Sequence, residues 1–339
     1  MPLLRRDDRS PPGPMSVTRV PTLEGIRAAA EMLSPPFCQT PLIHALHLSR
    51  LLDADVWIKV ESINSIGSFK SRGATVAIGR AIDRRGVTQI VTSSTGNHGQ
   101  GVALASLQRG IECHIFLPAE PNPVKLKMIE SLGAIVHKIG EDLDHAKAEA
   151  VSFAAERGAL FVDDGEDPDL MEGAGTVGLE IAEAFESLDD VFVPMGSANL
   201  AAGAATALKA IHPGVRVVAV QSEQAPAMAE SFARRTAVEL PAASIADGLE
   251  CRVPARLALE RIIALVDNVL TVPDEYLLRA CHTLLDVQHL VAEPAGAAAL
   301  AGAASIREEL SGHTVVLLVS GSNLTPAMLT RVLALPILT

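Results

Sequence analysis

Residues 89–109 of this chain read QIVTSSTGNHGQGVALASLQR. The first four, residues 89–92, are mostly β-branched and favour a buried strand. Small polar residues follow, and residues 98–109 then have the length and composition of a helix. A strand that leads through a short polar loop into a helix is the repeating unit of a parallel sheet. This segment therefore predicts an α/β fold with a candidate ligand-binding loop at the end of the strand.

The same alternation of short β-branched runs and longer alanine-rich runs continues along most of the chain. Strands are predicted at residues 56–60, 89–92, 112–117, 134–138, 191–194, 215–221, 268–272 and 314–320. Helices are predicted at residues 69–84, 98–109, 123–132, 143–157, 171–187, 200–212, 274–285 and 295–310. Such alternation is typical of βαβ units, so we expect parallel-rich sheets covered by helices.

The composition excludes several classes of protein. Of the 339 residues, 48 % are hydrophobic and 20 % charged, a balance that excludes intrinsic disorder. Only 3 % are aromatic, so the core is expected to consist of Ala, Val, Ile and Leu. The net charge is −12 without a local basic patch, so we expect no nucleic-acid partner. No apolar run reaches the roughly 20 residues of a membrane helix, so we expect no membrane partner.

Residues 1–15 are rich in Arg, Asp, Pro and Gly, and we expect a flexible leader there. The cysteines, Cys38, Cys113, Cys251 and Cys281, are too far apart in the sequence to suggest a metal-binding pair or a disulfide scaffold. This usage fits a reducing compartment, so we expect a cytoplasmic protein.

A lysine follows the first of three small-residue loops that precede predicted helices. Residues 65–74 read SIGSFKSRGA, which places Lys70 at the start of the helix predicted at residues 69–84. Partial burial there would favour the neutral amine, the form that Schiff-base chemistry needs. The alternative is an ordinary surface lysine near a helix start, and this segment alone favours that alternative.

The second loop, within the segment quoted first, gathers donors at one helix N-terminus: Ser94, Thr95, Gly96, Asn97 and His98. Unpaired backbone N–H groups and the helix dipole favour a carboxylate or phosphate at such a place. Capping needs only one of these residues, so we favour anion binding over simple capping by Ser94 or Thr95. His98 is also a candidate general acid or base, although the sequence shows no partner for it.

The third loop, within residues 194–203, again lies between a predicted strand and a predicted helix. Its small side chains would let backbone amides close around a phosphate, although an ordinary tight turn explains them equally well. Gly173, Gly175 and Gly178 also spell a dinucleotide-type G-x-G-x-x-G motif. The residues before them predict a helix, whereas the motif requires a strand, so we assign these glycines to close helix packing. A nicotinamide-dependent dehydrogenase stays the alternative from another class.

Taken in order, these segments resemble the fold type II pyridoxal-phosphate enzymes, and among them the serine/threonine dehydratase group that includes serine racemase. The resemblance runs from about residue 20 to the C-terminus, and residues 67–74 are its most specific part. It implies a tryptophan synthase β-like α/β fold of two domains with pyridoxal 5′-phosphate in the cleft between them. We expect a small domain at residues 65–165 and a large domain at residues 16–64 and 166–339.

The resemblance also implies roles for individual residues. Lys70 would hold the cofactor as a Schiff base beside Phe69, and Ser320 would face the pyridine nitrogen. Asn97 would lie beside the phenolic oxygen of the cofactor. The substrate would be bound by Ser94, Thr95, Gly96, Asn97 and His98. The phosphate cup would consist of Gly196, Ser197, Ala198, Asn199 and Leu200.

The implied reaction is that of an ammonia-lyase. A ring nitrogen that faces a hydroxyl stays largely unprotonated, which favours prompt loss of a β leaving group. The enzyme would remove water and ammonia from threonine or serine and release a 2-oxo acid, with the leaving hydroxyl protonated by the phosphate or by solvent. Substrates that stay open are 3-hydroxyaspartate, a phenylserine and an intermediate of hydroxyectoine breakdown. A β-replacement synthase and an apo-like binding protein also stay open, and we expect a homodimer acting on a small amino acid.

The sequence departs from the family pattern at three places. Side chains replace glycines in the phosphate cup at Ser197, Ala198 and Asn199, which narrows the cup but supplies extra donors for the phosphate. Thr95 stands where racemising members have a serine, so we do not expect racemisation. No metal is expected, because the positions of the acidic cation ligands are taken by Gln221, Ala225 and Ala227.

Overall fold

In the computed structural model, which describes residues 19–35, 37–120 and 123–339, the strands form two sheets. The predicted leader at residues 1–15 lies outside the described residues. The six-stranded sheet has the order β1-β2-β10-β7-β8-β9. Its strands are β1 (Leu42–His44), β2 (Asp55–Val60), β7 (Asp190–Pro194), β8 (Arg216–Ser222), β9 (Asn268–Val272) and β10 (Thr314–Val319). The β1–β2 pair is antiparallel and the other pairs are parallel.

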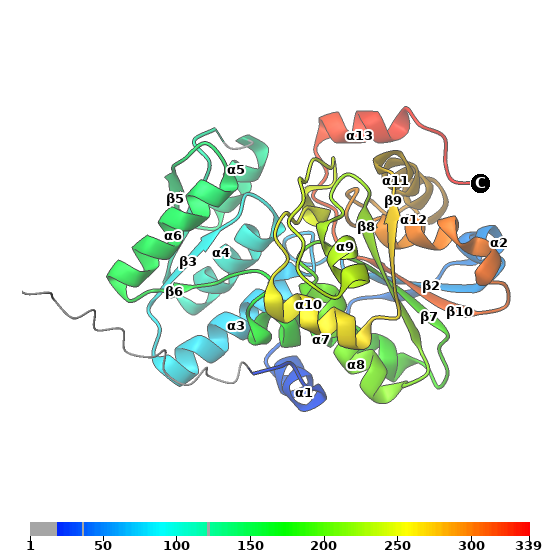
Figure 1. The fold of residues 1–339 in the computed structure, drawn as a ribbon, viewed down its shortest axis with the longest axis horizontal. Helices are drawn as coiled ribbons and strands as arrows, with labels where there is room; N and C mark the ends of the chain where they lie inside the picture. The colour runs from blue at the N-terminus through cyan, green and yellow to red at the C-terminus, as the bar shows by residue number, and fades with distance from the viewer. Residues whose placement is uncertain (1–18, 36, 121–122) are drawn as a thin grey trace, which may run out of the picture.

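The four-stranded sheet has the order β5-β4-β3-β6, and its pairs are all parallel. Its strands are β3 (Gln89–Ser93), β4 (Glu112–Leu117), β5 (Ile135–Lys138) and β6 (Leu160–Phe161). Figure 1 shows this sheet with α4, α5 and α6 on the left and strands β7 to β10 on the right. The α/β class with parallel-rich sheets is therefore confirmed.

Helices surround both sheets. They are α1 (Leu23–Glu31), α2 (Leu46–Leu52), α3 (Lys70–Arg85), α4 (Asn97–Arg109), α5 (Pro123–Ser131), α6 (Leu143–Arg157), α7 (Pro168–Ala184), α8 (Asn199–Ile211), α9 (Ala227–Arg234), α10 (Arg256–Leu265), α11 (Asp274–Gln288), α12 (Ala298–Ser305) and α13 (Pro326–Leu333). Two short 3₁₀ turns are η1 (Asp247–Leu249) and η2 (Arg307–Glu309).

Every strand and helix predicted from the sequence is present, but some boundaries differ. Helix α7 begins three residues early, because Asp167 caps it through the N–H of Asp169 (2.8 Å) and Pro168 suits its first turn. The helix predicted at residues 295–310 was too long: α12 ends at Ser305, whose hydroxyl donates to the Gly302 carbonyl (2.7 Å). The short strands β1 and β6 were not predicted, since strands of three and two residues are too short to show the hydrophobic pattern of a strand.

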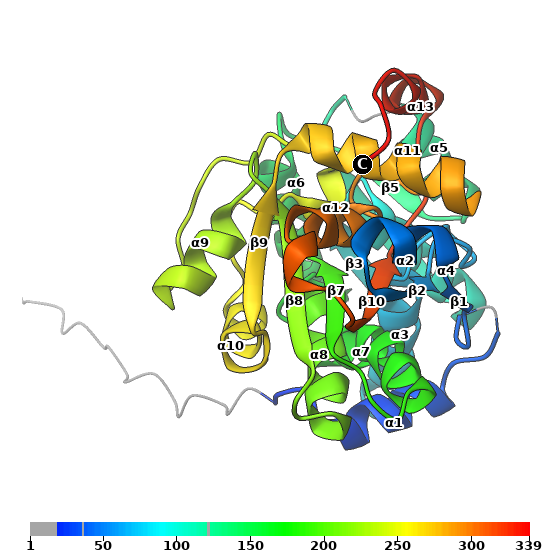
Figure 2. The same ribbon diagram turned by 90° about the vertical axis from the view of Figure 1, so that its right-hand side faces the viewer.

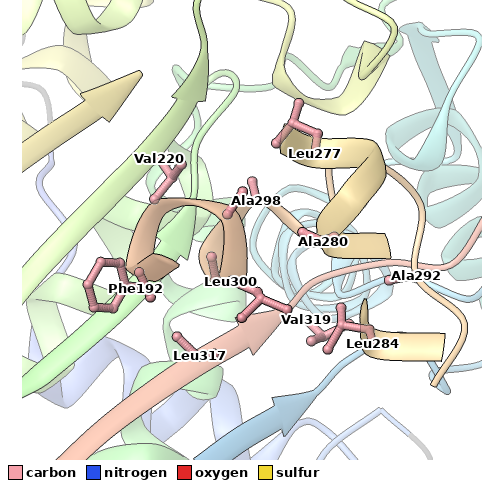
Figure 3. Close-up of a cluster of buried hydrophobic side chains, with 14 of the residues drawn as sticks. Phe192, Val220, Leu277, Ala280, Leu284, Ala292, Ala298, Leu300, Leu317 and Val319 are labelled. Atoms are coloured by element: carbon pink, nitrogen blue, oxygen red, sulfur yellow. The ribbon is translucent and has the colours of Figure 1, made fainter. Parts of the chain in front are cut away.

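The core of the larger sheet is aliphatic, as the composition predicts. Figure 3 shows Leu300 of α12 and Leu284 of α11 packed near the strand residues Leu317 and Val319. Phe192 is the only aromatic residue labelled there, and it is fully buried. Burying each such side chain contributes roughly 1.5–3 kcal/mol, so this layer holds the sheet against α11 and α12.

The three glycines of the G-x-G-x-x-G match lie inside helix α7, where they permit close packing. A Cβ on Gly175 would lie 2.8 Å from the Gly203 carbonyl oxygen of α8, and one on Gly178 would lie 2.6 Å from the Cα of Ala204. On another face of α7, a Cβ on Gly173 would lie 2.7 Å from the Cα of Gly73 in α3. Helix packing is thus the confirmed interpretation. Figure 2 shows α7 and α8 together with α1, on the side opposite α11 and α13.

Candidate active site

The three small-residue loops meet at one cavity of about 490 Å³. This volume is within the usual range of about 300–1,000 Å³ for small-molecule sites. The cavity is lined by every residue predicted for the site, namely Phe69, Lys70, Ser94, Thr95, Gly96, Asn97, His98, Gly196, Ser197, Ala198, Asn199, Leu200 and Ser320. Strands β3, β7 and β10 all end at this cavity, which is where ligands bind in parallel α/β sheets.

Lys70 is the first residue of α3, and its amine points into the cavity. Its Nζ forms an ion pair with Asp164 and lies 5.2 Å from the centre of the Phe69 ring. The turn before it depends on Gly67, which has a left-handed φ of 64°. A Cβ at Gly67 would also lie 3.0 Å from the Ser322 hydroxyl oxygen. The loop therefore presents Lys70 from a turn that favours glycine.

The Ser94–His98 loop leads directly into α4. Gly96 is the N-cap of α4, and no side chain caps this helix in the part of the chain that the structure describes. The Ser94 hydroxyl accepts a hydrogen bond from the Gly96 N–H (3.2 Å). Capping by Ser94 or Thr95 was therefore the wrong alternative, and the N-terminus of α4 faces the cavity with its backbone donors.

His98 is 7 % exposed, and its ring contacts the Val162 carbonyl oxygen at 3.4 Å. Burial lowers the pKa of His98, and the nearby Asp164 carboxylate only partly opposes this. The imidazole is therefore neutral at neutral pH. In this form it can donate one hydrogen bond and accept another, but it adds no positive charge to the cavity.

Asn97 is held in one orientation by two side chains from the other end of the chain. Its Nδ2 donates to Glu293 Oε1 (2.6 Å), and its Oδ1 accepts from Asn323 Nδ2 (2.5 Å). Burial raises the pKa of Glu293. A Cβ on Gly321 would lie 2.2 Å from Glu293 Oε1, so a larger residue there would displace the Glu293 carboxylate from Asn97.

The Gly196–Leu200 loop has the backbone of an anion cup. A Cβ on Gly196 would lie 2.3 Å from the Gly248 carbonyl oxygen, and Ala198 has a left-handed φ of 68°. Helix α8 begins at Asn199, so its unpaired N–H groups and its dipole favour a negative ligand. A phosphate would rely on these backbone groups.

The side-chain donors of this loop contact a carboxylate in the structure. Ser197 Oγ donates to Asp164 Oδ2 (2.7 Å), and Asn199 Nδ2 donates to Asp164 Oδ1. In the structure a carboxylate from another loop accepts from both side chains, and their role as extra donors for the phosphate stays a prediction.

Asp164 was not found from the sequence. It lies between β6 and α7, and its carboxylate contacts Lys70, Ser197 and Asn199, with His98 Nδ1 3.9 Å away. Burial alone would raise its pKa, but Lys70 above all holds the pKa below the usual range. Because the two-residue strand β6 was not predicted, the loop that follows it was not recognised as part of the site.

Ser320 directly follows β10 and is 5 % exposed. Its carbonyl oxygen accepts a hydrogen bond from the Phe69 N–H (3.1 Å), which ties this turn to the Lys70 segment. An amine, an anion cup and a buried hydroxyl thus lie around one cavity, and this donor set fits pyridoxal 5′-phosphate.

Residues 33–321 match the family model of the pyridoxal-phosphate-dependent enzymes. The chain belongs to this family. An L-threonine ammonia-lyase of Geobacter sulfurreducens is 36 % identical over 88 % of this chain and 75 % of its own length. A catabolic L-threonine dehydratase of Staphylococcus aureus is 34 % identical over 94 % of this chain and 92 % of its own. Maize serine racemase is similar in structure, with a TM-score of 0.87 and 28 % identity over 93 % of this chain and 98 % of that one.

Membership in this pyridoxal-phosphate-dependent family identifies the cofactor and leaves no role for a dinucleotide motif. Among residues 19–35, 37–120 and 123–339, no cluster of three or more His, Cys, Asp or Glu side chains is arranged to hold a metal ion. None of the helices described there is long and apolar enough to cross a membrane.

Proposed function

We propose that this enzyme is an ammonia-lyase that removes water and ammonia from a 3-hydroxy amino acid, with threonine or serine as the first candidates. The observation that carries the proposal is the meeting of Lys70, the two anion-binding loops and Ser320 at one cavity. The names of the two sequence relatives support the same reaction class.

The residues that would hold the cofactor are Phe69, Lys70, Asn97, Gly196, Ser197, Ala198, Asn199, Leu200 and Ser320. When bound, pyridoxal phosphate withdraws electrons from the Cα of an amino acid. The Ser320 hydroxyl would face the ring nitrogen and, unlike a carboxylate, would not hold a proton there. This favours early departure of the β substituent.

The chain's own groups account for the remaining tasks. The amine of Lys70 would take the Cα proton, and the α4 N-terminus with Ser94, Thr95 and His98 would hold the substrate carboxylate. Thr95 would lie on the face of Cα opposite Lys70, where its methyl group hinders delivery of a proton. Elimination is then expected in preference to racemisation.

We also propose the domain and assembly assignments that the sequence predicts. All four strands of the smaller sheet fall within residues 65–165, which supports a small domain there and a large domain formed by residues 16–64 and 166–339. The widely spaced cysteines support a cytoplasmic location. A homodimer is expected, and light scattering coupled to gel filtration tests it.

The assignment of Lys70 is tested by Lys70→Ala. The purified enzyme should be yellow and lose this colour on borohydride treatment, and it should form a 2-oxo acid from threonine or serine. The variant should lose the colour and the turnover but keep its far-ultraviolet circular dichroism. Lys147→Ala is the matched control, because Lys147 lines the same cavity but pairs with Asp163 at 2.9 Å. A Lys70→Ala protein with unchanged absorbance and activity would show that another lysine holds the cofactor.

A panel of hydroxy amino acids distinguishes among the substrates that stay open. Release of 2-oxo acid from each member, compared by kcat/KM, identifies the preferred side chain. If no member gives a 2-oxo acid, the lyase proposal is wrong, whatever the colour of the protein.

A further inference from the structure

The amine of Lys70 has a carboxylate as its direct neighbour. Lys70 Nζ forms an ion pair with Asp164 Oδ2, and both side chains line the cavity. Lys70 begins α3, whereas Asp164 lies 94 residues further along the chain, between β6 and α7. The two side chains are 17 % and 24 % exposed, so solvent screens the pair only in part. Asp164 therefore acts on the charge of the nitrogen that the proposed function assigns to the cofactor.

Asp164 is held in place by contacts that do not involve Lys70. Ser197 Oγ donates to Asp164 Oδ2 (2.7 Å), and Asn199 Nδ2 donates to Asp164 Oδ1. Asn199 is 3 % exposed and is the first residue of α8, so it has a rigid support. A change in the bonding of Lys70 leaves both of these hydrogen bonds intact. The carboxylate would therefore stay beside the Lys70 nitrogen when that nitrogen is bonded to a cofactor.

The other titratable groups that face Asp164 are uncharged. Burial alone would raise the pKa of Asp164, but Lys70 above all holds it below the usual range. His98 Nδ1 lies 3.9 Å away, and burial lowers the pKa of this imidazole, so it is neutral. Burial, with a smaller contribution from Asp164, raises the pKa of the Cys251 thiol to about 12, so this group keeps its proton. Asp164 and Lys70 are therefore the charge pair of this part of the cavity.

A nitrogen in a Schiff base exists in a protonated, positive form and in a neutral form. A negative charge within about 4–6 Å favours the positive form, and such a neighbour shifts a protonation equilibrium by about 1–3 pH units. Asp164 supplies this charge from a fixed position next to Lys70 Nζ. The arrangement of the two side chains thus favours a proton on the nitrogen of Lys70, whether or not that nitrogen is bonded to a carbon of the cofactor.

We propose that Asp164 is the counter-ion of the Lys70 nitrogen and keeps a proton on it while Lys70 holds pyridoxal phosphate. This rests on the proposed function, which assigns the cofactor to Lys70, and it gives an electrostatic role to a residue outside the predicted site. The same carboxylate serves the proton transfer proposed for Lys70. A Lys70 amine that has taken the Cα proton is an ammonium group, and it then lies beside Asp164 as in the present ion pair.

The test follows the visible spectrum of the holoenzyme against pH, without an amino acid present. The yellow band belongs to the protonated Schiff base, and it gives way to absorption at shorter wavelength when the nitrogen loses its proton. Asp164→Asn should lower the pH midpoint of this change by about 1–3 units, because the neutral amide no longer favours the positive form. The phosphate of the cofactor is the same in both proteins, so the difference reports the charge of Asp164.

The structure indicates that the site accommodates asparagine at position 164. Asn199 Oδ1 has no hydrogen-bond partner among the residues that the structure describes. A turn of the Asn199 amide would let this oxygen accept from the new Nδ2, while Ser197 Oγ could still donate to the new Oδ1. Asp164→Ser removes the same charge with a smaller side chain and should lower the midpoint in the same direction. The bound cofactor and the far-ultraviolet circular dichroism of each variant are measured alongside.

Asp163→Asn is the matched control. Asp163 is the neighbouring residue and lines the same cavity, but it pairs with Lys147 at 2.9 Å. Removal of its charge should move the midpoint by less than about 0.5 unit, since this partly exposed charge is screened by solvent and by its own partner. A structural role of Asp164 would lower the stability of its variants without moving the midpoint.

Two outcomes overturn the inference. An unchanged midpoint in either Asp164 variant that holds the cofactor would mean that the carboxylate does not face the nitrogen in the holoenzyme, for example because the phosphate takes over Ser197 and Asn199. Equal shifts in the Asp163 and Asp164 variants would mean that the general charge of the cavity, and not Asp164, sets the protonation. Failure of the lyase proposal is recognised separately, by the absence of 2-oxo acid, which the titration does not use.

Discussion

Ser320 lies at the end of a central strand, where one hydroxyl is expected to face the ring nitrogen of the cofactor. The hydrogen bond from the Phe69 N–H to its carbonyl oxygen (3.1 Å) ties its backbone to the Lys70 segment, and the residue is buried. Loss of a buried hydrogen-bond partner costs about 1–3 kcal/mol. The proposed role of Ser320 therefore rests on its hydroxyl oxygen, which a substitution by alanine removes.

Ser320→Ala is expected to weaken cofactor binding and to slow elimination, each by about 5- to 100-fold. Cofactor affinity is measured by dialysis against a cofactor-free buffer and titration with pyridoxal phosphate followed by visible absorbance. The elimination rate is measured from 2-oxo acid formation. Ser322→Ala is the control, because the Ser322 hydroxyl donates to the Ser62 carbonyl (2.7 Å) outside the cavity lining. If Ser320→Ala keeps both the affinity and the rate, another residue faces the ring nitrogen.

Thr95 provides a second test at the residue scale. Since Gly96 caps α4 and no described side chain does, a serine at position 95 gains nothing as a cap. Thr95→Ser is instead expected to open space opposite Lys70 and to produce measurable D-serine from L-serine. Chiral chromatography of the incubated amino acid decides the matter. Abundant D-serine from the unmodified enzyme would contradict the expectation that this lyase does not racemise its substrate. If neither protein forms D-serine, Thr95 is not the residue that prevents racemisation.

At the scale of elements, helix α7 lies between α3, which begins with Lys70, and α8, whose N-terminus is the proposed phosphate cup. The glycines at these contacts let the helix backbones approach closely. A Cβ on Gly203 of α8 would lie 2.2 Å from the Met171 carbonyl oxygen of α7, and this backbone atom has little room to move. The spacing of α7 and α8 therefore depends on glycine.

Gly203→Ala is expected to lower the free energy of unfolding by about 1–3 kcal/mol through overpacking. Gly214→Ala is the matched control, because no atom lies within 4 Å of the Cβ it would add. That control should be neutral or slightly stabilising, by up to about 1 kcal/mol, since alanine restricts the unfolded chain. Urea denaturation of the holoenzyme compares the two variants. Equal denaturation midpoints would show that α7 and α8 move apart at little cost in free energy.

At the scale of the whole molecule, a buried charged cluster joins the strand β2 region to α3 and α7. Arg72 is fully buried, and its guanidinium donates to Glu61 (2.7 and 2.9 Å) and to Glu180 (2.5 and 3.0 Å). Arg72 lies two residues after Lys70, so the same helix turn carries the proposed catalytic amine and this anchor. The cluster therefore positions α3 against the larger sheet.

Arg72→Met is expected to lower the free energy of unfolding by about 3–5 kcal/mol, because it leaves Glu61 buried without its partner. Arg84→Met is the control on the same helix: its side chain is 54 % exposed and its pair with Asp169 contributes about 0–1 kcal/mol. Chemical denaturation at pH 7 measures both. A loss of less than about 1 kcal/mol in Arg72→Met would show that solvent or another cation replaces the guanidinium.

The same cluster predicts a pH dependence. Burial alone would raise the pKa of Glu180, but the hydrogen bond and the charge of Arg72 hold it below the usual value of 4.5. Its stabilising contribution is thus present above pH 4.5 and is lost as the pH falls through the lowered pKa. Denaturation midpoints measured at falling pH should show that Arg72→Met loses less stability on acidification than the unmodified enzyme does.

The elements and most of the site were predictable because their signals are local. The β-branched runs of β3 and β7, and the small residues that follow each strand, identify strand–loop–helix units within about 20 residues. The family resemblance predicted that the loops at Ser94, Gly196 and Ser320 meet at one cleft, although β3 belongs to the smaller sheet and β7 and β10 to the larger one. The cavity lined by all three agrees with that.

The sequence by itself determined the α/β class and the order of most elements, since periodicity and turn chemistry act over a few residues. Through the family resemblance it also predicted which loops hold the cofactor. Only the tertiary structure brought Asp164 to Lys70, 94 residues away, and Glu293 to Asn97, 196 residues away. The charge of a carboxyl group depends on its burial and on the cations around it, and neither is a property of neighbouring residues in the sequence. The partner of the Lys70 amine was therefore decided by the fold, through the two-residue strand β6 that places Asp164 in the cavity.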